Sequence, residues 1–149
     1  MSLKQRLAED LKTAMRARDE AALSALRLLK AAVTNREIEL GAELEEPELL
    51  RLVEKQLKQR RESSTVYRQG GRPELAEREE REAAVLETYL PEPLPPEALE
   101  QLVEATIAEL GASSMKEMGP VMKSVVAKAQ GRADSKAVSE LVRRKLSSR

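Results

Sequence analysis

The chain holds few residue types that can perform acid–base or nucleophilic chemistry. Its 149 residues include no histidine and no cysteine, which removes the commonest general base, the commonest metal ligands and any thiolate or disulfide. The closest approach to a nucleophile is Ser113, which stands three residues before Lys116. In some acyl-transfer enzymes a Ser-x-x-Lys spacing lets the lysine activate the serine. The companion motifs are absent, so we interpret the serine as a helix-capping residue and predict no catalytic residue, cofactor or metal site.

Four charged residues fall on helical faces that otherwise carry apolar side chains. They are Arg36, Arg60, Glu79 and Glu82. An unpaired buried charge is costly, so we predict that these residues form structural ion pairs across the first group of helices. A carboxylate pair that performs acid–base catalysis is the alternative, although no nucleophile or metal partner is evident.

Basic residues gather at the C-terminal end, where a polyanion could bind. Residues 119–149 hold 8 basic and 2 acidic side chains, although the whole chain has 26 of each. The residues that we predict to contact RNA are Lys123, Lys128, Arg132, Lys136, Gly119 and Gly131. The cations would neutralise phosphate beside a helix N-terminus, and the glycines would let the backbone approach. This stretch has no aromatic residue, so we expect contact with folded RNA rather than base stacking; a merely solvated surface is the alternative.

A second basic face is possible on the helix expected after Pro47. Its members follow one another at helical spacing opposite a row of leucines, and they are Arg51, Lys55, Lys58 and Arg61. Composition alone favours a solvated face over a binding surface here. These residues are therefore secondary candidates.

Helical periodicity runs along almost the whole chain, and no segment alternates as a strand would. The composition is rich in Ala, Leu, Glu, Lys and Arg and lacks Phe and Trp, which also favours helices. We therefore predict an all-α, multihelical fold of two helical subdomains. Four helices are expected before residue 91, with breaks near Arg18, at residues 41–46 and at residues 70–71.

A proline-rich segment divides the chain. Residues 91–96 contain four prolines, which remove backbone N–H donors and keep the preceding residues out of a helix. We therefore predict an N-terminal helical subdomain at residues 1–90, a stiff linker at residues 91–96 and a C-terminal three-helix subdomain at residues 97–149.

Local signals predict the helix ends of the C-terminal part. Pro120 predicts a kink, or a short turn followed by a helix that begins near this residue. Ser114 and Glu117 have the spacing of a capping box. Gly131 fits a helix stop, and Asp134 is expected to cap the last helix.

The N-terminus is charged from Lys4 onward and lacks the apolar stretch of a leader peptide. No uncharged apolar run approaches the roughly 20 residues that a membrane span requires. We therefore expect a cytoplasmic protein with no membrane partner.

Several short segments spread over the whole chain match the pattern of a known family. They are Ser2–Lys4, Asn35–Glu39, Lys58–Ser63, Glu87–Pro91, Gly111–Lys116, Gly119–Lys123 and Gly131–Asp134, together with Asp10 and Met15. Through these segments the chain resembles the YqeY-like family, small bacterial proteins related to the tail of the GatB subunit of the tRNA-dependent amidotransferase. The resemblance implies an all-helical fold of two subdomains. It also implies a role with tRNA, because the corresponding GatB tail is associated with gripping the body of tRNA.

The resemblance further implies a link to carbon–nitrogen ligase activity with glutamine as amido-N-donor. The catalytic GatB domain with its metal and ATP site is not in this chain, so its residues do not support autonomous enzymatic activity. We predict an RNA-binding accessory module for tRNA or another folded RNA, acting alongside amidotransferase or aminoacyl-tRNA synthetase subunits. The alternative is a protein–protein adaptor that acts through the N-terminal helices.

Overall fold

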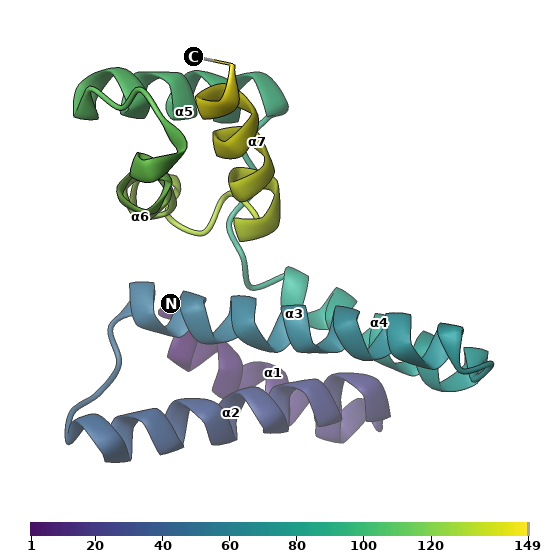
Figure 1. Cartoon of the computed structure of the whole chain (residues 1–149). Coiled ribbons are helices and arrows are strands. Elements are labelled where there is room, and N and C mark those ends of the chain that lie inside the picture. The colour runs from purple at the N-terminus through teal and green to yellow at the C-terminus, as the bar shows by residue number, and fades with distance from the viewer. Residues whose placement is uncertain (149) are drawn as a thin grey trace. The chain divides into compact units, whose positions relative to one another are not determined.

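The computed structural model describes residues 1–148, and every regular element within them is a helix (Figure 1). The predicted all-α fold is confirmed. Contacts divide the chain into two compact units, of which the first is Met1–Leu90 and the second begins at Pro91. Each unit has its own cluster of buried apolar side chains.

The first unit contains four helices, coloured from purple to teal in Figure 1. Their bounds are Leu3–Ala17 for α1, Glu20–Leu40 for α2, Glu46–Gln69 for α3 and Pro73–Glu87 for α4. Helix α1 packs against α2, and α4 packs against both α2 and α3. The core draws buried side chains from all four helices.

Aliphatic side chains supply almost all of this first core. The leucines and valines with no more than 1% of their surface exposed are Leu26, Leu29, Leu49, Val53 and Leu86. They recur at spacings of three and four, which places them on one face of each helix. Burying one such side chain contributes about 2 kcal/mol, so leucine and valine replace the aromatic residues that many cores contain.

Short local signals set the helix boundaries of the first unit. Arg18 adopts the left-handed conformation after α1 with φ 54°, and the Asp19 side chain accepts a hydrogen bond from the Ala22 N–H at 3.1 Å. This cap satisfies one of the donors that the first turn of a helix leaves open. Pro47 and Pro73 lie in the first turns of α3 and α4, where the missing N–H has no intrahelical partner to lose.

Tyr89 fastens the end of the first unit to α1. The residue is 3% exposed, and its hydroxyl donates to Asp10 Oδ2 at 2.5 Å. The Arg6 guanidinium lies 4.3 Å from the ring centroid and donates to the Thr88 carbonyl at 2.8 Å. Burial, and then the Asp10 carboxylate, raise the pKa of Tyr89, so the phenol stays a neutral donor. These contacts hold the chain just before Pro91 against the N-terminal helix.

Removing the Tyr89 hydroxyl is expected to destabilise the first unit. Tyr89→Phe keeps the ring but removes the hydroxyl that donates a hydrogen bond to the Asp10 carboxylate. A hydrogen bond to a charged group contributes about 2 kcal/mol, so the free energy of unfolding should fall by about this amount. Urea denaturation followed by circular dichroism measures the loss. Tyr67→Phe is the matched control, because within residues 1–148 the Tyr67 hydroxyl forms no hydrogen bond. If Tyr89→Phe and Tyr67→Phe are equally stable, the hydrogen bond between Tyr89 and Asp10 does not stabilise the first unit.

The second unit contains three α-helices and one 3₁₀ helix. Their bounds are Pro96–Leu110 for α5, Met115–Glu117 for the 3₁₀ helix, Met118–Ala129 for α6 and Ser135–Ser147 for α7. Each pair of α-helices is in contact. Six apolar core residues are completely buried, and they are Val103, Ile107, Val121, Val125, Val138 and Val142.

Pro120 is accommodated at the start of α6. The helix begins at Met118, so the proline occupies its third position, where the backbone N–H would lack an intrahelical acceptor anyway. The 3₁₀ helix lies directly before it. The predicted short turn followed by a helix near Pro120 is therefore observed.

Two predicted caps at the C-terminal helices are wrong in detail. Ser114 makes no side-chain cap, and the Glu117 carboxylate instead accepts the N–H of Ser113. A capping box needs an α-helix that starts just after the serine, whereas α6 starts only at Met118. Asp134 does occupy the N-cap position of α7, but its side chain forms no cap hydrogen bond.

The proline-rich segment is attached to the second unit. The Leu94 N–H donates to the Arg132 carbonyl at 2.7 Å, and Arg132 Nε donates to the Glu92 carbonyl at 2.9 Å. The loop after α6 therefore holds the segment from both directions. Residues 92–94 are part of the second unit rather than a free spacer.

Candidate nucleic-acid interface

Lys123 and Lys136 are the predicted RNA contacts with an unpartnered charge. Lys123 lies on α6 and Lys136 lies in the first turn of α7, and both residues are exposed. In the described part of the chain neither lysine forms an ion pair or a hydrogen bond through its side chain. Both ammonium groups are therefore available to phosphate.

The two predicted glycines have different structural reasons. Gly131 has φ 79° and follows Gln130 at φ 49°, so the turn after α6 accounts for a glycine there. Gly119 lies in the first turn of α6 without a positive φ, and a Cβ built on it meets no atom of a non-neighbouring residue within 4 Å. It directly precedes Pro120, however, and a Cβ on a helical residue at this place clashes with the proline ring. The proline therefore accounts for a glycine at this exposed position.

Lys128 and Arg132 are already engaged inside the second unit. Lys128 Nζ lies 2.5 Å from Glu109 Oε2 and 3.5 Å from Thr106 Oγ1, both on α5. The Nε–H of Arg132 donates a hydrogen bond to the Glu92 carbonyl. The structure brings these two cations to one hollow beside α5. They are therefore poorer candidates for free phosphate contacts than Lys123 and Lys136.

Lys145 is neutralised in the same way. Its Nζ lies 2.5 Å from Glu100 and 2.8 Å from Glu104, and these carboxylates raise the pKa of Lys145. Counting charges along the sequence thus overstates the positive charge that a ligand meets. Two further exposed cations of α7 form no ion pair within residues 1–148, and they are Arg143 and Arg144.

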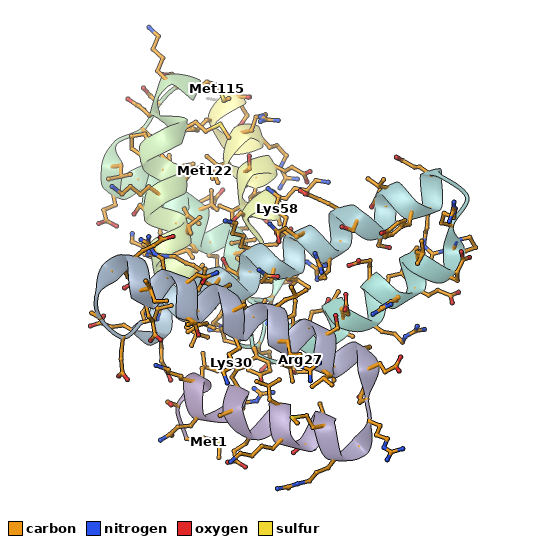
Figure 2. The ribbon with its side chains drawn as sticks, turned by 90° about the horizontal axis from the view of Figure 1, so that it is seen from below. Met1, Arg27, Lys30, Lys58, Met115 and Met122 are labelled. Atoms are coloured by element: carbon orange, nitrogen blue, oxygen red, sulfur yellow. The ribbon has the colours of Figure 1, made fainter. Side chains whose placement is uncertain are left out.

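The basic face predicted on α3 is partly neutralised. All four of its residues are exposed, and Figure 2 labels Lys58 on this helix. Lys58 lies 3.9 Å from Glu62, and Arg61 lies 2.6 Å from Glu87. Arg51 and Lys55 complete the face. On each of the two predicted surfaces, two of the four cations are therefore engaged by other groups of the protein.

Arg60 joins α3 to α4 through two carboxylates. Its Nε lies 3.1 Å from Glu79, its Nη1 lies 3.7 Å from Glu82, and the three side chains are 17%, 16% and 4% exposed. Arg60 Nε and Glu79 Oε2 are buried and form no well-aligned hydrogen bond within the described residues. Arg36 does not cross the bundle as predicted, because it is exposed and pairs at 2.9 Å with Glu39 of its own helix.

Glu79 is expected to make the first unit less stable as the pH rises. Burial raises the pKa of Glu79 above its ordinary 4.5, and the nearby Arg60 only partly opposes this. The folded state then holds the proton more tightly than the unfolded state, so stability falls as the pH rises from the ordinary value through the raised pKa. Glu79→Gln should remove this loss in urea denaturation between about pH 4 and about pH 8.

Comparing the unchanged chain with the Glu79→Gln variant isolates the contribution of Glu79 to the pH dependence of stability. Other carboxylates act in the opposite direction, since Lys4, for example, lowers the pKa of Glu37. Glu79→Gln should consequently be at least as stable as the unchanged chain at neutral pH. A glutamine variant that is less stable at neutral pH would show that the charge of Glu79 is needed.

The Ser-x-x-Lys spacing does not assemble a nucleophile with its base. The Ser113 N–H is the donor to Glu117, and no hydrogen bond within residues 1–148 joins the Ser113 hydroxyl to the Lys116 amine. Among the same residues no group of three potential ligands is placed to hold a metal ion.

Comparison with known families identifies the chain. The family model described as "Yqey-like protein" matches residues 4–146. The chain belongs to the YqeY-like family. The resemblance inferred from the short matching segments is therefore confirmed. This YqeY-like protein is a helical module related to GatB.

Several relatives carry the name "Altered inheritance of mitochondria protein 41, mitochondrial". The protein of Pyrenophora tritici-repentis is 31% identical over 140 residues, which cover 92% of this chain and 77% of the relative. The Lachancea thermotolerans protein is 32% identical over 118 residues, covering 78% and 62% of the two chains. The Vanderwaltozyma polyspora protein is 32% identical over 126 residues, covering 82% and 66%. The YqeY-like chain thus spans between 62% and 77% of these relatives.

The names of these relatives place them in mitochondria. They give no support to the expectation of a bacterial, cytoplasmic protein. Within the part of the chain that the structure describes, no helix is both long and apolar enough to cross a bilayer.

Proposed function

We propose that this YqeY-like protein is an accessory module that binds tRNA or another folded RNA through its second unit, alongside an amidotransferase or aminoacyl-tRNA synthetase subunit. The observation that carries the proposal is the pair Lys123 and Lys136, which are exposed and have no ion-pair partner in residues 1–148. Helix α6 contains no acidic residue that would repel phosphate. Membership in a family related to GatB favours tRNA as the RNA.

The chemistry of the surface suits a folded RNA better than a single strand. The only aromatic residues of the chain are Tyr67 and Tyr89, and both lie in the first unit. Unpaired bases are usually held by stacking on aromatic rings, whereas duplex RNA is held through phosphate and ribose. Lysine ammonium groups together with an accessible backbone at Gly119 supply contacts of the second kind.

Titration of the full chain with tRNA tests this function. The logarithm of the affinity should fall linearly with the logarithm of the salt concentration, because phosphate contacts release counterions. A single-stranded RNA of equal length should bind more weakly. Equal binding of tRNA and heparin at the same charge would reduce the interaction to nonspecific attraction and refute the proposal.

Gly119→Ala is expected to test whether a bound RNA approaches the backbone at this position. The added Cβ meets no atom of a non-neighbouring residue, but it crowds the Pro120 ring in a helical backbone, so stability should fall slightly and tRNA affinity is compared where both proteins are fully folded. If phosphate approaches the backbone here, one lost contact of about 1 kcal/mol weakens tRNA binding about fivefold. Fluorescence anisotropy with labelled tRNA measures the change.

Gly70→Ala is the matched control for this change. Gly70 is also exposed and also lacks a positive φ, and its added Cβ comes no closer than 3.4 Å to another residue. The control should leave tRNA affinity unaltered. Tight binding by Gly119→Ala would mean that the backbone at 119 is not approached.

A protein–protein adaptor is the second candidate function. Helix α2 exposes Leu28 and Ile38, at 43% and 72%, on the face that also carries Ala31 and Asn35. This face lies opposite the buried Leu26 and is not covered by the first unit. Ile38→Lys should then release a protein that copurifies with the full chain, while tRNA affinity stays the same. Retention of that protein would argue against the adaptor.

A further inference from the structure

A hollow in the second unit lies beside the linker, α5 and the end of α6. Its volume is ≈ 400 Å³. The aliphatic part of its wall is formed by Leu94, Ala98, Leu102 and Ala129, and its cations are Lys128 and Arg132. No carboxylate belongs to the wall among the residues that the structure describes. The hollow therefore combines an aliphatic surface with positive charge.

The two cations are presented differently. Lys128 is held from outside the hollow by Glu109, whose carboxylate is 64% exposed and can be displaced. Arg132 donates only through Nε, to the Glu92 carbonyl, so within residues 1–148 its two Nη groups carry no hydrogen bond. A guanidinium with free Nη donors matches the two oxygens of a carboxylate.

The loop that carries Arg132 is fixed in position. Gln130 and Gly131 adopt successive left-handed conformations, with φ 49° and 79°, and turn the chain back after α6. The Arg132 carbonyl then accepts the Leu94 N–H at 2.7 Å. The left-handed conformation of Gln130 is a common way for a helix to end, and it directs the loop toward Leu94. A side chain held before binding loses little entropy on binding.

We propose that this hollow binds a partner protein through a segment in which an aliphatic side chain stands next to a carboxylate. The aliphatic side chain would fill the space between Leu94 and Leu102, and the carboxylate would meet Lys128 and Arg132. RNA fits this wall less well, because it offers no aliphatic group and the wall has no aromatic ring for a base. The hollow is thus distinct from the RNA contacts proposed at Lys123 and Lys136.

A matched pair of dipeptides tests the proposal on the full chain. The probes are N-acetyl-leucyl-aspartyl amide and its neutral isostere N-acetyl-leucyl-asparaginyl amide, titrated against ¹⁵N-labelled protein by NMR. The aspartyl probe should shift the amides of Ala98, Leu102 and Gln130, and the asparaginyl probe should bind about tenfold more weakly. Equal binding of both probes, or shifts spread over basic residues of both units, would overturn the proposal.

Three variants sharpen the result. Lys128→Met keeps an unbranched side chain but removes the charge, and should lower the affinity for the aspartyl probe about fivefold. Glu109→Gln removes the carboxylate that pairs with Lys128 and should raise the affinity for this probe. Lys123→Ala should leave the affinity for the probe unchanged and lower only the affinity for tRNA. If tRNA displaces the probe, and Lys128→Met weakens tRNA as much as Lys123→Ala does, the hollow belongs to the RNA surface and the protein partner is refuted.

Discussion

Replacing Arg60 by methionine is expected to destabilise the first unit by about 3 kcal/mol, because it leaves two buried carboxylates without their counter-charge. Glu79 and Glu82 approach this guanidinium from α4, and the side chain of Glu82 is 4% exposed. Methionine preserves the aliphatic part of the side chain, so the loss reports the charge. Stability should partly return at acidic pH, where the carboxyls take up protons.

Tyrosine fluorescence follows this change in the first unit alone, since both tyrosines of the chain lie there. Arg61→Met is the neighbouring control. Arg61 pairs with Glu87 between side chains that are 52% and 51% exposed, and exposed pairs contribute about 0.2–1 kcal/mol. If Arg60→Met and Arg61→Met lower the stability of the first unit equally, the burial of the Arg60 ion pairs does not increase their contribution to stability.

Reversing both Lys123 and Lys136 to glutamate should abolish tRNA binding by the full chain at physiological salt. Each lysine that contacts a phosphate contributes about one unit to the slope of log affinity against log salt. The double alanine variant should thus retain binding at low salt with a slope reduced by about two. Charge reversal adds repulsion between the carboxylates and phosphate, so its effect is larger than that of alanine.

Lys12 and Lys30 provide the control for this double variant. Both are exposed helical lysines of the first unit, and changing both to glutamate alters the net charge by the same amount. Figure 2 labels Lys30 on α2. The control should keep most of its tRNA affinity. If both double variants lose affinity equally, net charge rather than a located surface governs binding.

Helix boundaries were predictable where a single residue decides them. Asp19 caps the next helix through its own side chain, and Pro73 begins one because its fixed φ suits a first turn. The prediction that Ser114 caps an α-helix was wrong, because a 3₁₀ helix follows this residue and α6 starts only at Met118. The spacing of two residues cannot show which type of helix lies between them.

The partners of long charged side chains were far less predictable. Arg60 meets carboxylates across α3 and α4, whereas Arg36 turns outward to Glu39 of its own helix. Lys128 reaches α5 and binds Glu109, which lies 19 residues earlier in the chain. Periodicity states which face a residue occupies, but the neighbouring helix determines whether its charge is already paired. This is why only part of the predicted RNA surface keeps free cations.

The most direct test of the proposed RNA surface is a map of where tRNA touches the protein. Ultraviolet crosslinking of the full chain to tRNA, followed by digestion and mass spectrometry of the linked peptides, provides this map. Crosslinks should concentrate in residues 119–136. Crosslinks concentrated on the α3 face at residues 51–61, or spread evenly over the exposed basic residues of both units, would contradict the proposed RNA surface.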